Sequence, residues 1–476
     1  MTERPTVPGL TIDSDHSRDL DDALWAVAEE RGIRVWVSIV DLTEVPGLQP
    51  GGAILTQALL RCQTEYRGTR ILRSMLPQEL EAAHSLLPDA PRPVLTWEAL
   101  IDNRGRVSEE RFYPATLVSH LRVNYAQTDA ILQGETRLEG SWVIVAASQA
   151  AAALNSRRTG LWGKAHGGQY YDDEGRVCDA SHALIASFAI AYNEAVARRL
   201  KGRPGCYRVH DPATDPEIRE LMETWSGPRE QLIPLVAHRL PSAEYADVPR
   251  AHWALNLPSY LRVTSPLRRV EDLVNQQQLV ARLRGDRRLP WNAFAIRDVV
   301  ERLNDRLLAE AERSRRLAKQ QMQRVAQSVE RAAAPVEVTE TVTDRQLAKL
   351  LRTAKESGEC SPGLERAVLS FIEEGRLTTR HMAEVLLGRE VFPAKLRRAV
   401  LTAVDPTVTD RHPVSVLNTL RTLSPELELQ EQFEPTEEGQ WCCQLQAGGQ
   451  QEAVVAPSKA QARQDAALAL LQALAE

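Results

Sequence analysis

A dense run of aspartates lies close to the start of the chain. Residues 13–22 contain five of them, and these are Asp13, Asp15, Asp19, Asp21 and Asp22. Carboxylates held this close repel one another, which raises their pKa values unless cations neutralise them. Magnesium prefers oxygen ligands and binds through a few carboxylates, keeping water or substrate phosphate as its other ligands. The run therefore predicts a magnesium site, and the reaction that such a site serves best is phosphodiester hydrolysis.

The same run has two other readings. A calcium loop of the EF-hand kind is excluded by position, because Arg18 lies where that loop needs glycine and Leu24 where it needs glutamate. A solvated turn with chance acidity stays open when the run is taken alone. No Gly-rich phosphate loop and no HExxH motif is present, so nothing in the sequence indicates ATP hydrolysis or a zinc site.

The residues after the run alternate in the way that β-strands do. Strands are predicted over 23–28 and 33–42, joined through the hairpin 29–32. The aspartates then lie on a loop that enters a sheet, where carboxylates and backbone carbonyls can converge. Helices and further strands follow in mixed order: helices over 52–60, 181–201 and 266–283, and strands over 95–101, 111–118 and 205–209. This order predicts an α+β body rather than a regular βαβ alternation.

The 476 residues are too many for one ordinary core, so several domains are expected. A long helix is predicted over 291–332, and the Ala-rich stretch ending at Pro335 marks a boundary. Short helices over 345–357, 362–374, 378–387 and 393–404 predict a small helical module. The last segment predicts an α-β-β-β-α order, with helices over 413–423 and 459–475. The expected domains are residues 1–335, 343–404 (helix-turn-helix-like) and 411–476.

Composition points to a globular protein without a membrane span. Apolar residues make up 43% of the chain and charged residues 26%, and no run of about eighteen apolar residues occurs. The six cysteines are scattered, which is typical of reduced thiols in a cytoplasm, and the start lacks a secretory signal. We expect a cytoplasmic monomer.

The net charge of −6 is unevenly distributed along the chain. Residues 413–476 hold three basic and nine acidic side chains, which also gives −6, so the first 412 residues are neutral overall. They contain basic clusters, and the local field of such a cluster, rather than the total charge, governs the binding of a polyanion.

Four stretches in collinear order resemble motifs of the ribonuclease II/R (RNB) family of 3′→5′ exoribonucleases. The first is the acidic run, in which Asp15 is extra to the family pattern. The others are Thr64-Glu65-Tyr66 with Ser74 to Leu80, Tyr207-Arg208-Val209-His210, and Val263-Thr264-Ser265-Pro266-Leu267-Arg268-Arg269 with Asp272-Leu273. The resemblance covers about 270 residues and implies an RNB-type catalytic body.

The resemblance also implies roles for individual residues. Asp13, Asp19, Asp21 and Asp22 would hold one or two magnesium ions, with manganese as a possible substitute, and Asp21 would matter most to the chemical step. Arg268 would reach the phosphate, since a planar bidentate donor matches phosphoryl oxygens. Three aromatic residues would contact bases or terminal nucleotides, and these are Tyr66, Tyr125 and Trp162. His210, on an apolar strand, is expected to be a hydrogen-bonded structural residue rather than a base.

The chain departs from the family pattern at several positions. A family glutamate falls at Gln321, a histidine at Arg262 and a tyrosine at Val270, and two acidic residues are missing at Ala186-Ser187. The family's two N-terminal cold-shock domains are expected to be absent. These departures motivate an alternative, a catalytically weak or inactive RNB-fold protein that binds RNA or regulates.

The expected function is magnesium-dependent 3′→5′ hydrolysis of single-stranded RNA to nucleoside 5′-monophosphates. The segment 411–476 resembles a double-stranded-RNA-binding domain, which grips phosphates with basic residues at the start of its last helix. Only Lys459 and Arg463 occupy that region here. Both duplex RNA and a protein partner therefore stay open as ligands of this segment.

Overall fold

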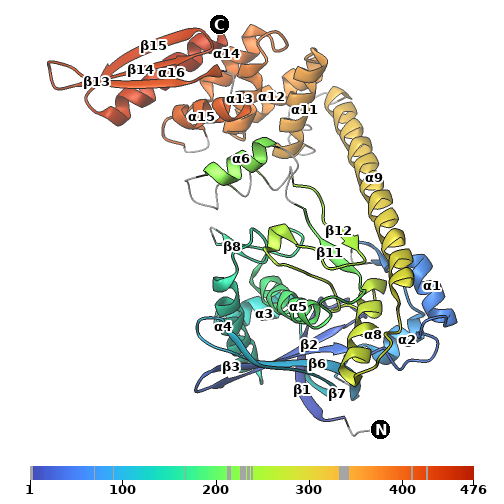
Figure 1. The fold of residues 1–476 in the computed structure, drawn as a ribbon. Coiled ribbons are helices and arrows are strands. Elements are labelled where there is room, and N and C mark those ends of the chain that lie inside the picture. The colour runs from blue at the N-terminus through green and yellow to red at the C-terminus, as the bar shows by residue number, and fades with distance from the viewer. Residues whose placement is uncertain are drawn as a thin grey trace. The chain divides into compact units, whose positions relative to one another are not determined.

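The computed structural model describes residues 4–68, 70–88, 90–166, 168–211, 216–225, 232, 236, 240–331, 342–408, 411–424 and 427–476. The chain folds into two compact units, Met1–Glu310 and Ala311–Glu476. The predicted domain limits 1–335, 343–404 and 411–476 stay predictions. Each unit is described below by itself (Figure 1).

A closed β-barrel forms the base of the first unit. Its strands follow the order β1 (Thr6–Ile12), β2 (Asp22–Glu29), β3 (Gly32–Val40), β6 (Arg92–Ile101) and β7 (Val107–Val123). Neighbouring strands are antiparallel except β1 and β7, which run parallel and close the barrel. The predicted hairpin is confirmed, since β2 pairs with β3 through Glu29 and Gly32. Closure removes sheet edges that would otherwise need covering.

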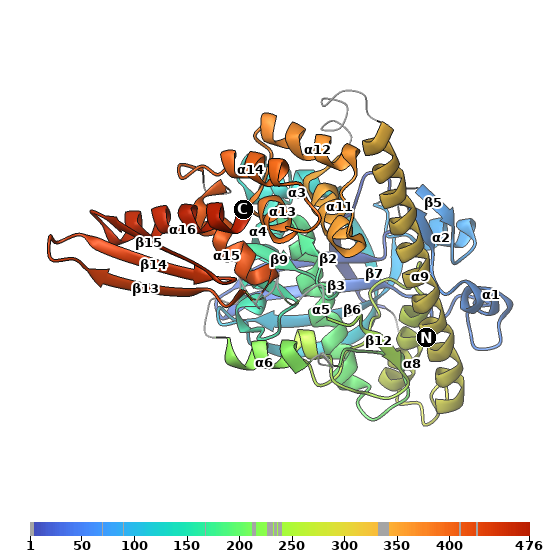
Figure 2. The ribbon, with the colours of Figure 1, turned by 90° about the horizontal axis from the view of Figure 1, so that it is seen from above.

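Helices cover the barrel on two sides. One core joins barrel residues such as Trp97 to α4 (Ser141–Arg157) and α5 (Ala180–Arg199). The ribbon views show these two helices beside the barrel strands (Figures 1 and 2). A second core joins the barrel to α1 (Ala53–Arg61), α8 (Val270–Arg284) and the first part of α9 (Ala293–Arg331). The remaining elements of this unit are α2 (Gln78–His84), α3 (Tyr125–Leu132), α6 (Pro216–Thr224), the 3₁₀ turn η1 (Trp253–Leu255) and the short strands β4 (Glu65–Arg67), β5 (Arg70–Arg73), β8 (Lys164–His166), β9 (Gln169–Tyr171), β10 (Val177–Cys178), β11 (Tyr207–Val209) and β12 (Glu244–Ala246).

Helix α8 is buried although it carries consecutive amide side chains. Asn275 accepts from the Cys206 N–H at 2.8 Å and donates to the carbonyls of Cys206 and Arg262. Gln276 accepts from the Leu42 N–H at 3.1 Å and donates to the Val40 carbonyl at 2.7 Å. Buried amides are stable where their hydrogen bonds are met. Asn275 therefore holds α8 to the segments that contain Cys206 and Arg262, and Gln276 holds α8 to the end of β3.

The predicted helix 266–283 begins later than expected, at Val270. Pro266 to Arg268 form a turn, and the extended backbone of Arg269 (φ −135°) precedes the helix. The turn is held by Asp21, which accepts from the Leu267 N–H, so this segment belongs to the site rather than to the helix.

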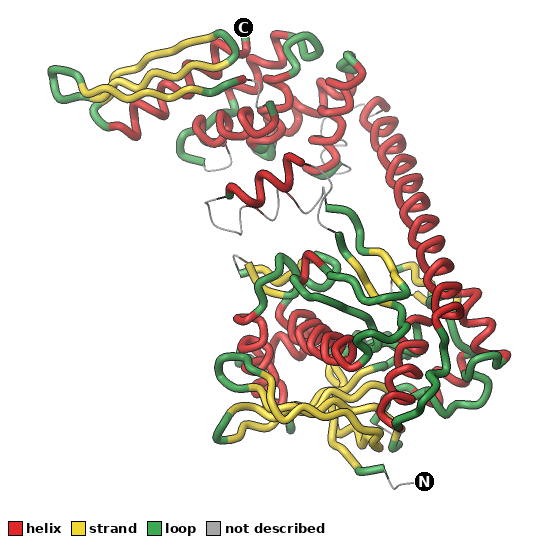
Figure 3. Tube along the Cα trace, in the orientation of Figure 1, coloured by secondary structure: helices red, strands yellow, loops and turns green. Residues whose placement is uncertain are grey.

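The second unit has one apolar core. It is shared by α11 (Asp344–Ser357), α12 (Pro362–Glu373), α13 (Thr379–Leu387), α14 (Ala394–Thr402), α15 (Pro413–Leu423) and α16 (Lys459–Ala475). The strands β13 (Gln430–Pro435), β14 (Trp441–Ala447) and β15 (Gln450–Ala456) form an antiparallel sheet (Figure 3). Cys443 and Leu445 of that sheet lie in the same core as Phe371 of α12. The predicted α-β-β-β-α order is confirmed.

All six cysteines are free thiols. Of the helices in the described ranges, none has both the length and the apolar character that crossing a membrane requires.

Candidate active site

The aspartate run lies where two barrel strands meet. Asp13 follows directly on β1 and Asp22 opens β2, so the loop between them leaves and re-enters the barrel at one end. Leu10 pairs with Leu24 in antiparallel register, which brings the two ends of the loop together. The prediction that the run lies on a loop entering a sheet is confirmed.

Asp21 joins this loop to a segment far along the chain. Its side chain is 2% exposed, and its two oxygens accept from the Leu267 N–H at 2.8 Å and from Arg268 Nε at 3.3 Å. The structure therefore brings together the two residues predicted to carry the chemistry. Charge-assisted hydrogen bonds of this kind fix orientation as well as add energy.

Burial and mutual repulsion raise the pKa values of the aspartates. Burial, followed by the charges of Asp22 and Asp21, raises the pKa of Asp13 to about 9. Burial likewise raises the pKa of Asp22 to about 6 and that of Asp21 well above its usual value, even though the Arg268 charge lowers both. A carboxylate cluster with raised pKa values is one that a cation would stabilise.

The donor set fits a hard divalent cation. The four predicted ligands Asp13, Asp19, Asp21 and Asp22 offer only oxygen, and Asp13 Oδ2 is buried with no hydrogen-bond partner in the part of the chain that the structure describes. Within the described ranges, however, no three His, Cys, Asp or Glu side chains converge with the geometry to hold a metal ion. Asp21 is turned to Arg268, and Asp19 accepts from the Tyr66 hydroxyl.

Two of the predicted aromatic residues lie beside the aspartates. Tyr66 on β4 is 41% exposed, and its hydroxyl donates to Asp19. Tyr125 opens α3 behind the Asn124 cap and stacks on His182, with ring centroids 3.7 Å apart. Burial and then the charges of Asp13 and Asp22 raise the pKa of Tyr125, which places its ring near those carboxylates.

The third aromatic residue is more enclosed. Trp162 is 6% exposed and packs on the His210 ring at a centroid distance of 4.9 Å, while still lining a cavity. His210 is buried, and its Nε2 donates to the Pro241 carbonyl at 2.9 Å, so this histidine is hydrogen-bonded as predicted; its purely structural role stays a prediction. The stacking role of Trp162 stays a prediction.

Two cavities meet at Arg268 and Arg269, which line both. The larger has a volume of about 640 Å³ and is lined by Tyr66 and Trp162. The smaller, about 220 Å³, is lined by Asp22. Ala186 also lines the smaller cavity, at one of the two positions where the family's acidic residues are missing.

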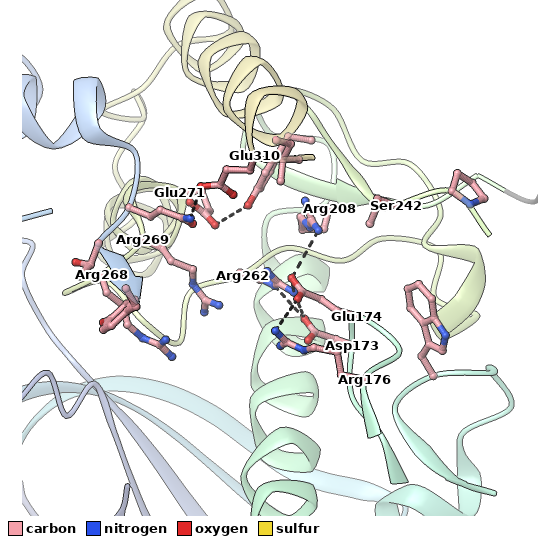
Figure 4. A pocket seen from close by; sticks show the side chains of 18 of the residues that line it. Asp173, Glu174, Arg176, Arg208, Ser242, Arg262, Arg268, Arg269, Glu271 and Glu310 are labelled. Atoms are coloured by element: carbon pink, nitrogen blue, oxygen red, sulfur yellow. Dashed lines mark hydrogen bonds and ion pairs between the residues drawn. The ribbon is translucent and has the colours of Figure 1, made fainter. Parts of the chain in front are cut away.

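The sequence did not predict a buried network of ion pairs that lines these cavities. Arg262 Nη2 donates to Asp173 Oδ2 at 2.7 Å and to Glu174 Oε1 at 2.8 Å, as the dashed lines in Figure 4 show. Although burial raises it, the Arg262 charge lowers the pKa of Asp173, and the same charge lowers the pKa of Glu174 to about 2. The replacement of the family's histidine by Arg262 was visible in the sequence, but its acidic partners, some ninety residues away, were not.

The two basic residues predicted to bind RNA in the second unit contact side chains of the neighbouring sheet. Lys459 Nζ lies 4.4 Å from the centroid of the Phe433 ring, and Arg463 Nε lies 2.6 Å from Glu431 Oε1. Gln321 lies exposed on α9.

Known proteins resemble the first unit. The RNB domain family matches residues 5–285. Ribonuclease R of Escherichia coli strain K12 is 26% identical over 314 residues, which cover 56% of this chain and 38% of that protein. Exoribonuclease 2 of Enterobacter sp. strain 638 is 28% identical over 329 residues, which cover 58% of this chain and 50% of that protein. The chain thus spans half or less of the length of these two relatives.

Solved structures show the same fold. Mycoplasma genitalium RNase R in complex with ribose methylated single-stranded RNA has a TM-score of 0.55 at 21% identity, covering 64% of this chain and 56% of that one. Yeast Ssd1, a pseudonuclease, has a TM-score of 0.52 at 16% identity, covering 63% and 43%. With the family match over more than half of its residues, the chain belongs to the RNB domain family.

Proposed function

We propose that this protein is a magnesium-dependent 3′→5′ exoribonuclease that hydrolyses single-stranded RNA to nucleoside 5′-monophosphates. One observation carries the proposal: a carboxylate cluster and a guanidinium meet at Asp21 and Arg268, and Arg268 also lines an arginine-rich cavity. The named relatives, a ribonuclease and an exoribonuclease, support the reaction class.

Residues of this chain would divide the work as follows. Asp13, Asp19, Asp21 and Asp22 would hold the metal, which when bound supplies an activated water and neutralises charge on the leaving oxygen. Arg268 would release Asp21 and donate two N–H groups to the scissile phosphate. Tyr66 and Tyr125 would hold the last bases, so that positioning and charge stabilisation provide most of the acceleration.

The first experiment separates an exonuclease from the alternative of an inactive RNA-binding protein. Single-stranded RNA labelled at its 5′ end is incubated with protein and magnesium, and we expect a ladder that shortens from the 3′ end. A circular RNA of the same sequence should stay intact, because it has no end. Retained binding without shortening at any metal concentration would favour the alternative, which the Ssd1 pseudonuclease likeness and the departures from the family pattern motivate.

The second experiment tests the assignment of Asp21. We expect Asp21→Asn to lower the turnover number about a thousandfold or more while leaving RNA affinity nearly unchanged, since the lost carboxylate acts on the reaction rather than on the strand. Asp15→Asn is the matched control, because Asp15 is extra to the family pattern and hydrogen-bonds Asn124 instead. Wild-type turnover by the Asp21 variant would refute the assignment.

A further inference from the structure

Arg208 is a buried cation on the wall of the larger cavity. It lies on β11 and is 5% exposed. Its guanidinium carbon lies 4.6 Å from the centroid of the Tyr245 ring, and the Tyr245 hydroxyl in turn donates to Glu271 at 2.7 Å. The strand and the ring beneath it thus fix the position of this side chain.

The other four arginines that line the cavity each have a carboxylate partner. The contacts are Arg262 to Asp173 at 2.7 Å, Arg269 to Asp272 at 2.7 Å, Arg176 to Asp172 at 2.8 Å and Arg268 to Asp21 at 3.3 Å. Arg208 differs from all of them. Its ion pair is with Glu174 Oε1 at 3.9 Å, beyond hydrogen-bond distance, and that oxygen already accepts from Arg262 at 2.8 Å.

The Nη1 amino group of Arg208 therefore makes no hydrogen bond within the described protein. Its Nη1 atom is buried and has no hydrogen-bond partner among the described residues. An unmet buried donor on a charged group is costly, and an anion that enters the cavity would remove the cost. The planar fork of arginine matches phosphate oxygens, and phosphate is the anion that RNA carries at every linkage. Figure 4 shows Arg208 apart from Arg268, on the other side of Arg262.

We propose that Arg208 binds a backbone phosphate of the RNA substrate, at a linkage upstream of the one being cleaved. The proposal rests on the proposed function for the identity of the ligand. Arg208 would then act as a length sensor: only an RNA long enough to reach from Arg268 to Arg208 makes the contact.

The test is a binding measurement that needs no catalysis. A series of 5′-fluorescent single-stranded RNAs, from the dinucleotide upward, is titrated against full-length protein in EDTA, and anisotropy gives the affinity. We expect Arg208→Gln to weaken the longer RNAs about tenfold and the dinucleotide hardly at all. The slope of log affinity against log salt should fall in magnitude by about 0.7, the value for one phosphate contact on a single strand. Arg208→Lys should restore most of that slope, because it keeps the charge.

Arg250→Gln is the control, since Arg250 is partly exposed and pairs with Asp211 and Glu244 rather than lining the cavity. Circular dichroism and thermal unfolding confirm that each variant is folded. An equal loss of affinity for short and long RNA, or no loss in a folded Arg208→Gln protein, would overturn the proposal. So would a nucleoside monophosphate that binds the wild type tightly and loses affinity in Arg208→Gln to the same extent as long RNA. If the wild type binds RNA in this pattern yet never cleaves it, the proposed function fails and the Arg208 contact stands.

Discussion

The charged side chains around the site of the first unit and those at the start of α16 in the second unit are used in different ways. In the described part of the first unit, Asp13 Oδ2 and Arg208 Nη1 are buried without hydrogen-bond partners, and burial, followed by the charges of Asp22 and Asp21, raises the pKa of Asp13 to about 9. In the second, Lys459 lies over Phe433 and Arg463 pairs with Glu431, so both cations at the start of α16 are used by their own sheet. A buried polar group without a hydrogen-bond partner in a native structure calls for an explanation, and a role in function is one. A buried polar group whose hydrogen bonds are made is explained by the structure alone.

This contrast bears on where RNA would bind. A phosphate that enters the cavity of the first unit would accept from Arg208 Nη1, which has no hydrogen-bond partner among the described residues. A phosphate that approaches α16 must first displace Phe433 or Glu431 from its cation. We therefore expect substitutions of the RNA-facing arginines of the first unit to change function more than stability, and substitutions at the start of α16 to do the reverse.

After the loss expected for Asp21→Asn, the largest expected effect is at the guanidinium that faces Asp21. We expect Arg268→Lys to lower kcat/KM about a hundredfold to a thousandfold, because lysine keeps the charge but loses the planar pair of donors. Single-turnover kinetics on labelled RNA would measure it, with the partly exposed Arg250→Lys as control. Near-wild-type kinetics would show that charge alone suffices, and would weaken the contrast.

A group of the first unit that is fully satisfied should behave differently. Asn275 makes three hydrogen bonds from the interior of α8, so Asn275→Ala should lower the free energy of unfolding by about 2–3 kcal/mol. Denaturant unfolding would measure the loss. The exposed Asn418→Ala should change it by less than about 0.5 kcal/mol. If Asn275→Ala leaves the free energy of unfolding unchanged, the hydrogen bonds of Asn275 do not stabilise the packing of α8.

An unmet group of the site should show the opposite sign. We expect Asp13→Asn to stabilise the metal-free protein by about 1–2 kcal/mol at neutral pH, because asparagine is buried without the proton uptake that burial and the charges of Asp22 and Asp21 impose on the Asp13 carboxyl. The folded pKa of about 9 lies above the ordinary 3.8, so the carboxyl's contribution is fully present below pH 3.8 and is lost as pH rises toward 9. Thermal unfolding in EDTA across this range should therefore fall more steeply with pH for wild type than for the variant. Added magnesium should make the wild type more stable than Asp13→Asn. If the variant is less stable than the wild type at every pH in EDTA, the explanation is wrong.

The smallest effects are expected at the start of α16. Lys459→Ala should cost about 0.5–1 kcal/mol of stability through the lost contact with Phe433. Affinity for duplex RNA in the full chain should change less than about twofold, because the ammonium is already engaged. Parallel unfolding and anisotropy titrations would measure both, and Arg463→Ala should follow the same pattern. A large loss of affinity for duplex RNA would show that RNA binds at the start of α16, and would contradict the difference proposed between the two units.

Much of the site was visible in the sequence because its residues lie in short motifs. The aspartate loop and the hairpin after it followed from local patterns, and the expectation that Asp21 and Arg268 serve one site followed from the family resemblance. The ion network of Arg262, Asp173 and Glu174 did not, because its members come from separate segments and their pairing depends on tertiary packing. The same reason hid the barrel, since the parallel pairing of β1 with β7 joins residues more than a hundred positions apart.

The helices of residues 343–404 and the α-β-β-β-α segment that follows are buried against each other through a single interior, where Phe371 and Cys443 belong to one cluster. Neither part could be transplanted without the other, because each would leave an apolar face open to water. We therefore expect recombination between genes to transfer the two parts together.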